Sequence, residues 1–292
     1  MDTCLSYTSG VLSFLIMFHV DRTRASLCFV SKRAYSYNYG VTVLTICLTI
    51  SLVLASTYLF AQNKQVTHQQ LLWFGYHNTL EWPNKWSVNT EIEERRFFNP
   101  DKQHQFLVRS QLKYTLGKDW NVAAGLAYFL QSPQNPRATE KLVVPELRPH
   151  LQLDYKQQIK KLSITHRYKA EMRFFRNTAN GELADGYNSN YRFRYRIGLE
   201  YTVAAINRQI LKLKVSDEIM LNAGKRIVNN SFDQNRIYGG LNYTLSKSVA
   251  VEAGYLKWFQ QRSSGIEYYD RDIVRLVVTH NISVGGKKKD DT

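Results

Sequence analysis

Charged side chains recur at every second position through long stretches of this chain. Arg192, Arg194 and Arg196 alternate with apolar residues in one segment, and Arg167 and Lys169 begin a similar series in another. Guanidinium groups bind anions through forked hydrogen bonds, and buried charges of either sign need partners. The arginine excess therefore predicts an anion-selective site or passage, or a network of ion pairs that fills an interior.

Histidines are the first candidates for acid–base chemistry near neutral pH. His77, His150 and His166 lie in segments with strand-like patterns. His166 and Glu171 together would suit a lipid hydrolase, but residues five apart on a strand face opposite sides. No serine stands in a nucleophile-elbow motif. We therefore expect no enzyme, and keep a lipid-modifying enzyme with His150 or His166 as base as the alternative.

The sequence indicates no metal and no cofactor. Its cysteines, Cys4, Cys28 and Cys47, all precede Ala61, and no metal-ligand spacing or calcium loop occurs. Paired glycines such as Gly239 and Gly240 lack the strand–turn–helix context of a phosphate loop.

The charged residues belong to segments that alternate apolar and polar positions. Between Tyr191 and Tyr201, the aromatic and aliphatic residues take one face and the charged residues take the other. Such alternation predicts strands with one dry and one wet face. Because the segments reach the 9–11 residues or more of a tilted bilayer crossing, we expect an all-β fold, a single antiparallel up-and-down transmembrane barrel.

The wet face of these strands would line the barrel. The predicted lumen-facing charged residues are Glu91, Glu93, Arg95, Arg109, Glu146, Arg148, His150, Arg167, Lys169, Glu171, Arg173, Arg192, Arg194, Arg196, Glu200, Glu218, Arg236, Glu252 and Arg275.

Connections between the predicted strands alternate between short turns and longer loops, as in outer-membrane barrels. The predicted long loops include 132–145 and 175–189. Aromatic residues gather near the short turns and are predicted to lie at the membrane interface: Trp82, Trp86, Tyr114, Trp120, Tyr155 and Tyr243. Eleven segments qualify as strands, from 70–82 to 270–284. Because single-chain bacterial barrels close with even numbers, we expect twelve strands, with 64–69 contributing to a missed one, or ten.

The first sixty residues predict an export signal. Residues 41–60 carry no charge, Lys32 and Arg33 precede them, and Ala61-Gln62 offers a small-residue cleavage position. A membrane anchor is the alternative. The predicted organisation is a leader at 1–61, of which 1–31 reflects a start assigned too far upstream or a long basic region, a barrel at 62–286 and a polar tail at 287–292.

The formal net charge of +15 has several explanations. Nucleic-acid binding is not expected, because the basic residues are spread along alternating strands rather than gathered on one face. The expected partners are membrane lipid and a small anion in the lumen. The predicted location is the outer membrane of a Gram-negative bacterium, after export through the periplasm, and a soluble periplasmic ligand-binding barrel is the alternative.

The chain resembles a family of uncharacterised outer-membrane barrels found mainly in Bacteroidota, DUF2490. The resemblance covers residues 70–284 and rests on Lys85–Ser87 with Glu91 and Arg95, on His166–Phe174, Asp217–Asn222, Asn235–Leu241 and Glu252–Tyr255. It implies an outer-membrane barrel and no established activity. The residues themselves lead us to expect a non-enzymatic barrel, either a narrow channel or a structural or binding barrel with an arginine-rich lumen.

Overall fold

The computed structural model describes residues 64–206 and 209–285. The expected leader, its cleavage position at Ala61 and Gln62, and the expected tail at 287–292 lie outside these residues. Within them the chain is all-β, and no helix is long and apolar enough to cross a membrane.

Eleven strands make up the described part of the chain, and they cover nearly every segment with an alternating pattern. They are β1 (Gln65–Glu81), β2 (Trp86–Phe97), β3 (Lys102–Leu116), β4 (Trp120–Gln131), β5 (Val144–Ile159), β6 (Leu162–Ala179), β7 (Glu182–Ile206), β8 (Gln209–Ala223), β9 (Phe232–Thr244), β10 (Val249–Gln261) and β11 (Glu267–Ser283).

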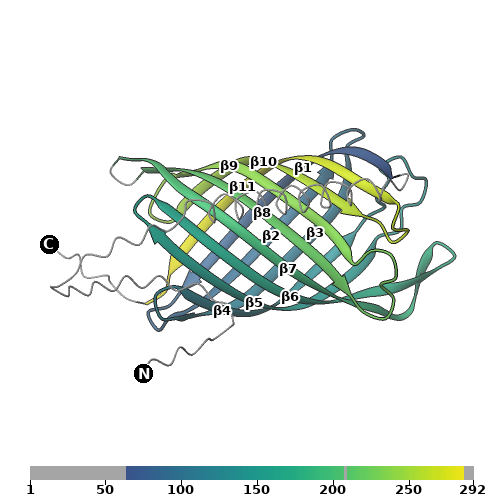
Figure 1. The fold of residues 1–292 in the computed structure, drawn as a ribbon, viewed down its shortest axis with the longest axis horizontal. Coiled ribbons are helices and arrows are strands. Elements are labelled where there is room, and N and C mark those ends of the chain that lie inside the picture. The colour runs from purple at the N-terminus through teal and green to yellow at the C-terminus, as the bar shows by residue number, and fades with distance from the viewer. Residues whose placement is uncertain (1–63, 207–208, 286–292) are drawn as a thin grey trace, which may run out of the picture. The chain divides into compact units, whose positions relative to one another are not determined.

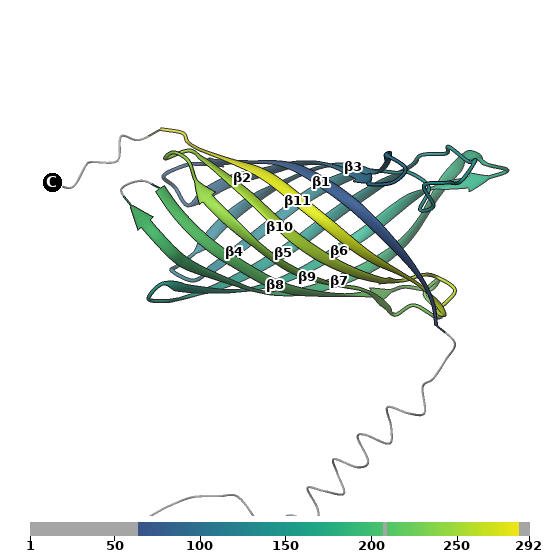
Figure 2. The ribbon, with the colours of Figure 1, turned by 90° about the horizontal axis from the view of Figure 1, so that it is seen from above.

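The strands form one closed barrel in which each is paired with its neighbours in the chain, and β1 is paired with β11 (Figures 1 and 2). All pairs are antiparallel except the last. The β1–β11 seam is parallel and continuous, from Gln65 opposite Glu267 to Glu81 opposite Ser283.

The parallel seam corrects two expectations. The described strands close as eleven, not twelve or ten, and the barrel is not antiparallel throughout. An odd number of alternating strands brings the first and last together in the same direction. Residues 65–69 supply no extra strand, because they extend β1 along β11.

The two ends of the barrel differ. The short-turn end carries the turns at 82–85, 117–119, 160–161 and 245–248, and the long-loop end carries the loops at 132–143, 224–231 and 262–266. A long loop was expected at 175–189. Instead β6 and β7 continue as a hairpin that projects at the long-loop end (Figure 1), turning at Asn180 and Gly181 with positive φ angles.

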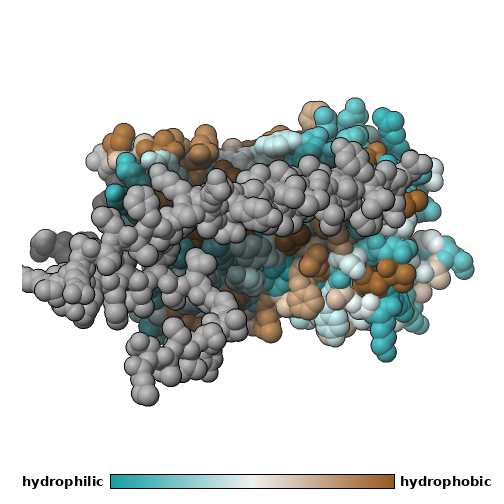
Figure 3. Space-filling model, in the orientation of Figure 1, coloured by the Kyte–Doolittle hydropathy of each residue, from teal (hydrophilic) through white to brown (hydrophobic). Residues whose placement is uncertain are grey.

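Alternation separates an apolar outer face from a polar lumen. Leu151 is 65% exposed on the outer face of β5, while its neighbour His150 is buried inside. In Figure 3 hydrophobic residues lie along the visible barrel wall, and many hydrophilic residues gather at the right, which is the long-loop end.

The predicted interface aromatics lie at the short-turn end, on the outer face or in the turns. Trp86 on β2 packs against Tyr114 on β3, with ring centroids 4.7 Å apart, and Trp120 on β4 packs against Tyr155 on β5 at 4.6 Å. Trp82 lies in the β1–β2 turn and Tyr243 near the end of β9.

Apolar side chains also fill part of the lumen, towards the long-loop end. Trp73 and Trp258 meet edge to face with centroids 5.7 Å apart, and they belong to a buried cluster. Its other members are Leu71, Phe97, Tyr238, Leu256 and Ile273. The barrel interior is therefore packed in one half and polar in the other.

Candidate functional site

The charged residues predicted to face the lumen all lie on the inward faces of their strands. Two sets of strands differ most in the partners that their charged residues make. The first set is β1, β2, β10 and β11, which we term the paired wall, and the second is β6 and β7, which we term the basic wall. The strand order places these two walls on opposite sides of the barrel.

In the paired wall, carboxylates hold the basic groups. Glu93 accepts a hydrogen bond from Arg95 Nη2 at 2.7 Å, and Arg275 Nη2 lies 3.4 Å from its other oxygen. Glu252 pairs with Arg275 at 3.0 Å and with Lys214 of β8 at 2.7 Å. Arg95, Arg275 and Lys214 each therefore have a counter-charge and need no ligand.

A second balanced group lies on β5 and β6. Glu146 is fully buried, and it accepts hydrogen bonds from Arg148 Nη2 and from Arg173 Nε, each at 2.6 Å. One carboxylate thus serves two guanidinium groups.

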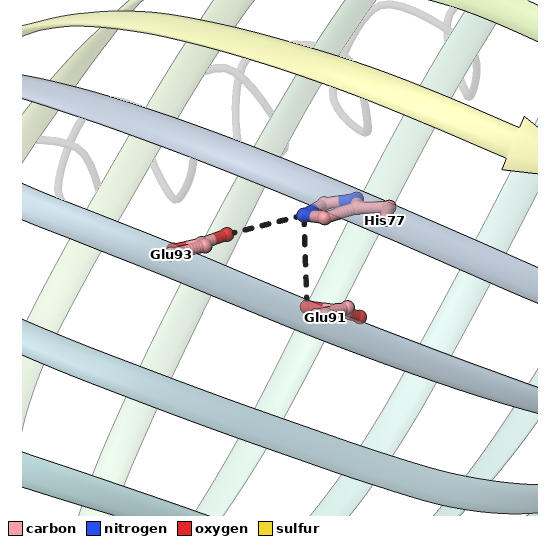
Figure 4. A group of neighbouring side chains, drawn as sticks. All are labelled: His77, Glu91 and Glu93. Atoms are coloured by element: carbon pink, nitrogen blue, oxygen red, sulfur yellow. Dashed lines mark hydrogen bonds and ion pairs between the residues drawn. The ribbon is translucent and has the colours of Figure 1, made fainter.

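His77 approaches two glutamates of the paired wall (Figure 4). Its Nε2 lies 3.3 Å from Glu93 Oε1 and 3.9 Å from Glu91 Oε2. These three groups are close enough together to hold a divalent cation. However, Arg109 pairs with Glu91, and Arg95 pairs with Glu93, so guanidinium groups already neutralise both carboxylates.

The basic wall brings like charges directly opposite each other. Arg167 on β6 faces Arg196 on β7, and Lys169 faces Arg194. Asp154 accepts a hydrogen bond from Arg167 Nε at 2.8 Å.

Arg194 is satisfied by two carboxylates, Glu171 at 2.7 Å and Glu218 at 2.8 Å. Lys169 and Arg196 make no hydrogen bond or ion pair with any described side chain. The basic wall therefore retains cations that its own carboxylates do not hold.

Two polar cavities lie along the lumen. A cavity of about 410 Å³ extends towards the short-turn end and is lined by groups such as Arg167, Arg196 and Lys214. A second, of about 500 Å³, includes residues 132–134 of the β4–β5 loop in its lining. We term them the short-turn cavity and the loop cavity.

A layer of arginines separates the two cavities, because the same four side chains line both: Arg95, Arg148, Arg192 and Arg236. Aromatic rings hold three of them. The guanidinium carbon of Arg95 lies 3.8 Å from the ring centroid of Trp73, and that of Arg148 lies 3.6 Å from Phe129. Arg236 lies 4.4 Å from Trp258. Carboxylates also pair with three of the four, since Arg95 pairs with Glu93, Arg148 with Glu146, and Arg192 with Asp233 at 2.7 Å. Among the described residues, Arg236 is the one member of the layer held by rings alone.

The β4–β5 loop folds into the long-loop end of the lumen through Gln134. Its Oε1 accepts a hydrogen bond from Arg271 Nη2 at 2.8 Å and lies 3.0 Å from His104 Nε2, while its backbone oxygen accepts one from Gln69 Nε2. Arg271 is fully buried and is also held by the amide oxygens of Gln69 and Gln260. These contacts fasten the loop to β1, β3 and β11.

The sequence prediction did not include several of these residues. Arg271 and Trp73 share the strand parity of Arg275 and His77, so alternation alone could have placed them in the lumen. Gln134 lies in a loop, where no periodic signal exists.

The two histidines considered as bases do not meet a catalytic partner in the described barrel. His150 Nε2 lies 3.1 Å from the amide oxygen of Gln111 in the lumen. His166 lies on the outer face, 2.8 Å from the Tyr195 hydroxyl. Neither ring makes a hydrogen bond to a serine, threonine or aspartate among the described residues.

Comparison with known proteins gave matches to a family model and to solved structures. A family model described as "Protein of unknown function (DUF2490)" matches residues 70–269. Among solved structures, a NanC porin in a rhombohedral crystal form is similar, with a TM-score of 0.43 and 12% identity over 72% of this chain and 98% of that one. No curated protein sequence matches the chain.

Proposed function

The chain belongs to the DUF2490 family, whose description assigns no activity, and we propose from the barrel itself that it is a non-enzymatic outer-membrane protein whose lumen binds and passes small anions. The main support for this proposal is the excess of positive charge in the lumen. The short-turn cavity is lined by ten basic and five acidic side chains.

The outer face supports a place in a membrane. Leu151 projects outward from β5, Phe193 and Tyr201 project outward from β7, and each is about half exposed or more. A monomeric soluble barrel exposes no apolar surface of this extent, whereas lipid would cover it. This observation favours the membrane over the soluble periplasmic alternative.

The lumen charge supports anions as the bound species. Excess guanidinium groups in an enclosed polar space attract anions and repel cations. The arginine layer lies between the two cavities, so an anion that crosses the barrel passes four guanidinium groups. Of these, Arg236 is held by aromatic rings and by no described carboxylate, so its positive charge is the most available to an anion.

The position of the β4–β5 loop supports a lumen that is closed at the long-loop end. Gln134 fastens the loop across the seam strands, and the buried aromatic cluster lies beneath it. Anions would therefore reach the arginine layer first from the short-turn end, and passage would need the loop to move. Catalysis is not part of the proposal, because the contacts of His150 and His166 activate no nucleophile.

Planar-bilayer recording tests the proposal. Full-length protein, expressed in a Gram-negative host and extracted from its outer membrane, is reconstituted across a KCl gradient. We expect a reversal potential that favours chloride over potassium. A potential at zero, or one that favours potassium, would contradict an anion-preferring lumen.

Membrane fractionation tests the location separately. We expect the protein in the detergent-extracted membrane fraction, with gel mobility that changes on heating, as closed barrels show. Recovery in the soluble fraction without detergent would contradict the membrane assignment.

A further inference from the structure

The basic wall contains an arrangement that ordinary sheet packing avoids. Two successive cross-strand pairs on β6 and β7, Arg167 with Arg196 and Lys169 with Arg194, carry the same charge. Directly opposed like charges destabilise a sheet, and the effect is stronger inside a lumen than in open water. Carboxylates hold one member of each pair, Arg167 and Arg194, and leave the other member without an ion pair.

Other unpaired cations of the lumen have alternative partners. Among the described lumen residues, Arg236 lies over the rings of Trp73 and Trp258, and Arg271 is held by glutamine oxygens and by rings. Lys113 is half-buried on β3, near the short-turn end. Lys169 and Arg196, like Lys113, make no ion pair or ring contact with a described residue, but only these two belong to the opposed pairs of β6 and β7.

Lys169 is the more confined of the two. It is 6% exposed, and its ammonium group makes no hydrogen bond within the described barrel. The residue opposite it on β5 is Gln152, which has a neutral amide. The Nε2 of Gln152 donates its hydrogen bond to Asp154. Glu171, two residues further along β6, shares the lumen face with Lys169 but already pairs with Arg194, so the ammonium has no carboxylate of its own.

We propose that Arg167, Lys169 and Arg196 bind a free tetrahedral oxyanion, of the phosphate or sulfate type, on the basic wall. This rests on the proposed anion-accepting lumen and assigns it a site and a ligand class. Arg167 and Arg196 line the short-turn cavity, so an ion that enters from that end reaches both.

The chemistry of the three groups favours an oxyanion over a halide. Guanidinium groups present paired N–H donors that match two oxygens of one ion, and the ammonium adds up to three donors. Arg167 donates only its Nε to Asp154, which leaves its terminal nitrogens free of carboxylates. An ion with two charges would also offset both opposed pairs at once.

Calorimetric titration of the detergent-extracted full-length protein tests this site. The probes are inorganic phosphate, sulfate and chloride at constant ionic strength, and each variant is first checked for heat-modifiable mobility. We expect phosphate or sulfate to bind at least tenfold more tightly than chloride. Arg196→Gln and Lys169→Gln should each weaken oxyanion binding by about tenfold, the loss of one or two charge-assisted hydrogen bonds.

Lys113→Gln is the matched control, because it removes one lumen charge away from the site. It should change oxyanion affinity less than about twofold. Equal losses in Lys113→Gln and Lys169→Gln would indicate general lumen charge and overturn the site. No preference of the wild-type protein for phosphate or sulfate over chloride would overturn it also.

The outcome is separable from the proposed function. If the bilayer recording shows chloride preference while titration shows no oxyanion preference, the lumen proposal stands and the site is wrong. If titration shows a site that needs Lys169 and Arg196 while the bilayer shows no conductance, the site stands in a closed binding barrel.

Discussion

The paired wall and the basic wall face each other across one lumen, yet they treat charge differently. On the paired wall, Glu93 and Glu252 hold Arg95, Arg275 and Lys214. On the basic wall, like charges oppose each other and Lys169 and Arg196 lack partners among the described residues. A small barrel must fill its interior with side chains whatever its function, so a lumen cation that pairs with a carboxylate has a structural role. The unpaired positions are the ones that need a ligand.

The contrast also exists within one strand. Arg194 and Arg196 both face inward from β7, two residues apart, but two carboxylates hold the first and none holds the second. Arginines on the same face of one strand can therefore differ in role. Arg194 is held in structural ion pairs, whereas Arg196 is available to bind a ligand.

Removing a carboxylate from the paired wall should have the largest effect. Glu93→Gln leaves Arg95 and Arg275 without one of their counter-charges, and we expect a loss of roughly 3–5 kcal/mol in the free energy of unfolding, as for other broken buried pairs. Urea unfolding in detergent measures it. Glu140→Gln, in the exposed β4–β5 loop, is the control. A loss below about 1 kcal/mol would mean that water replaces the partner.

Arg194→Gln should cost less, roughly 2 kcal/mol, because Glu171 and Glu218 lose a charge-assisted donor but remain near other cations. Arg196→Gln, two residues away, should leave stability unchanged or slightly higher. Parallel urea titrations of the two variants check the difference. Equal losses would remove the distinction drawn within β7.

Gln134→Ala removes an amide oxygen from Arg271 on the paired wall. Because Gln69 and Gln260 still hold this arginine, we expect a loss of about 1 kcal/mol or less. The β4–β5 loop should detach more often, and bilayer recording should show longer or more frequent openings. Gln158→Ala, at the opposite end, should not change them. Unaltered gating in Gln134→Ala would show that this loop does not close the passage.

Arg196→Glu should give the smallest change in stability and a clear change in selectivity. It places opposite charges across from Arg167, so we expect a gain of about 0.5–1 kcal/mol in phosphate-free buffer. The reversal potential should shift towards potassium. Arg196→Gln separates charge removal from pair formation, and a shift no larger than in Arg196→Gln would argue against Arg196 lying on the ion path.

Strand alternation accounts for most of what could be predicted. Residues 191–201 and 146–157 specified their inner and outer faces, because a period of two fixes the side of each side chain. The positive-φ turn at Asn180 and Gly181 was missed, although Asn-Gly between alternating strands is a strong hairpin signal. The expected even number of strands came from a general rule for bacterial barrels. No local pattern in the sequence indicates how many strands close the barrel or which strands form the seam.

The candidate site was only partly predictable. Alternation placed Arg167, Lys169 and Arg196 on one face, but which cations find carboxylates depends on the register between strands. A shift of two residues would put Lys169 opposite a different partner without changing any face. Contacts of Gln134 depend on how a loop without periodicity folds back.

The parallel seam between β1 and β11 also limits how the connectivity of the chain could be changed. In a barrel with an even number of strands, the two ends lie at one rim, and a few residues could join them to make a circular permutant. Here Gln65 and Ser283 lie at opposite rims. A joining segment would have to cover the 17 residues of β1, about 55 Å, through lipid or through a filled lumen. A circular permutant with a short linker is therefore not expected to fold. New chain ends could be made only by splitting the barrel into two chains.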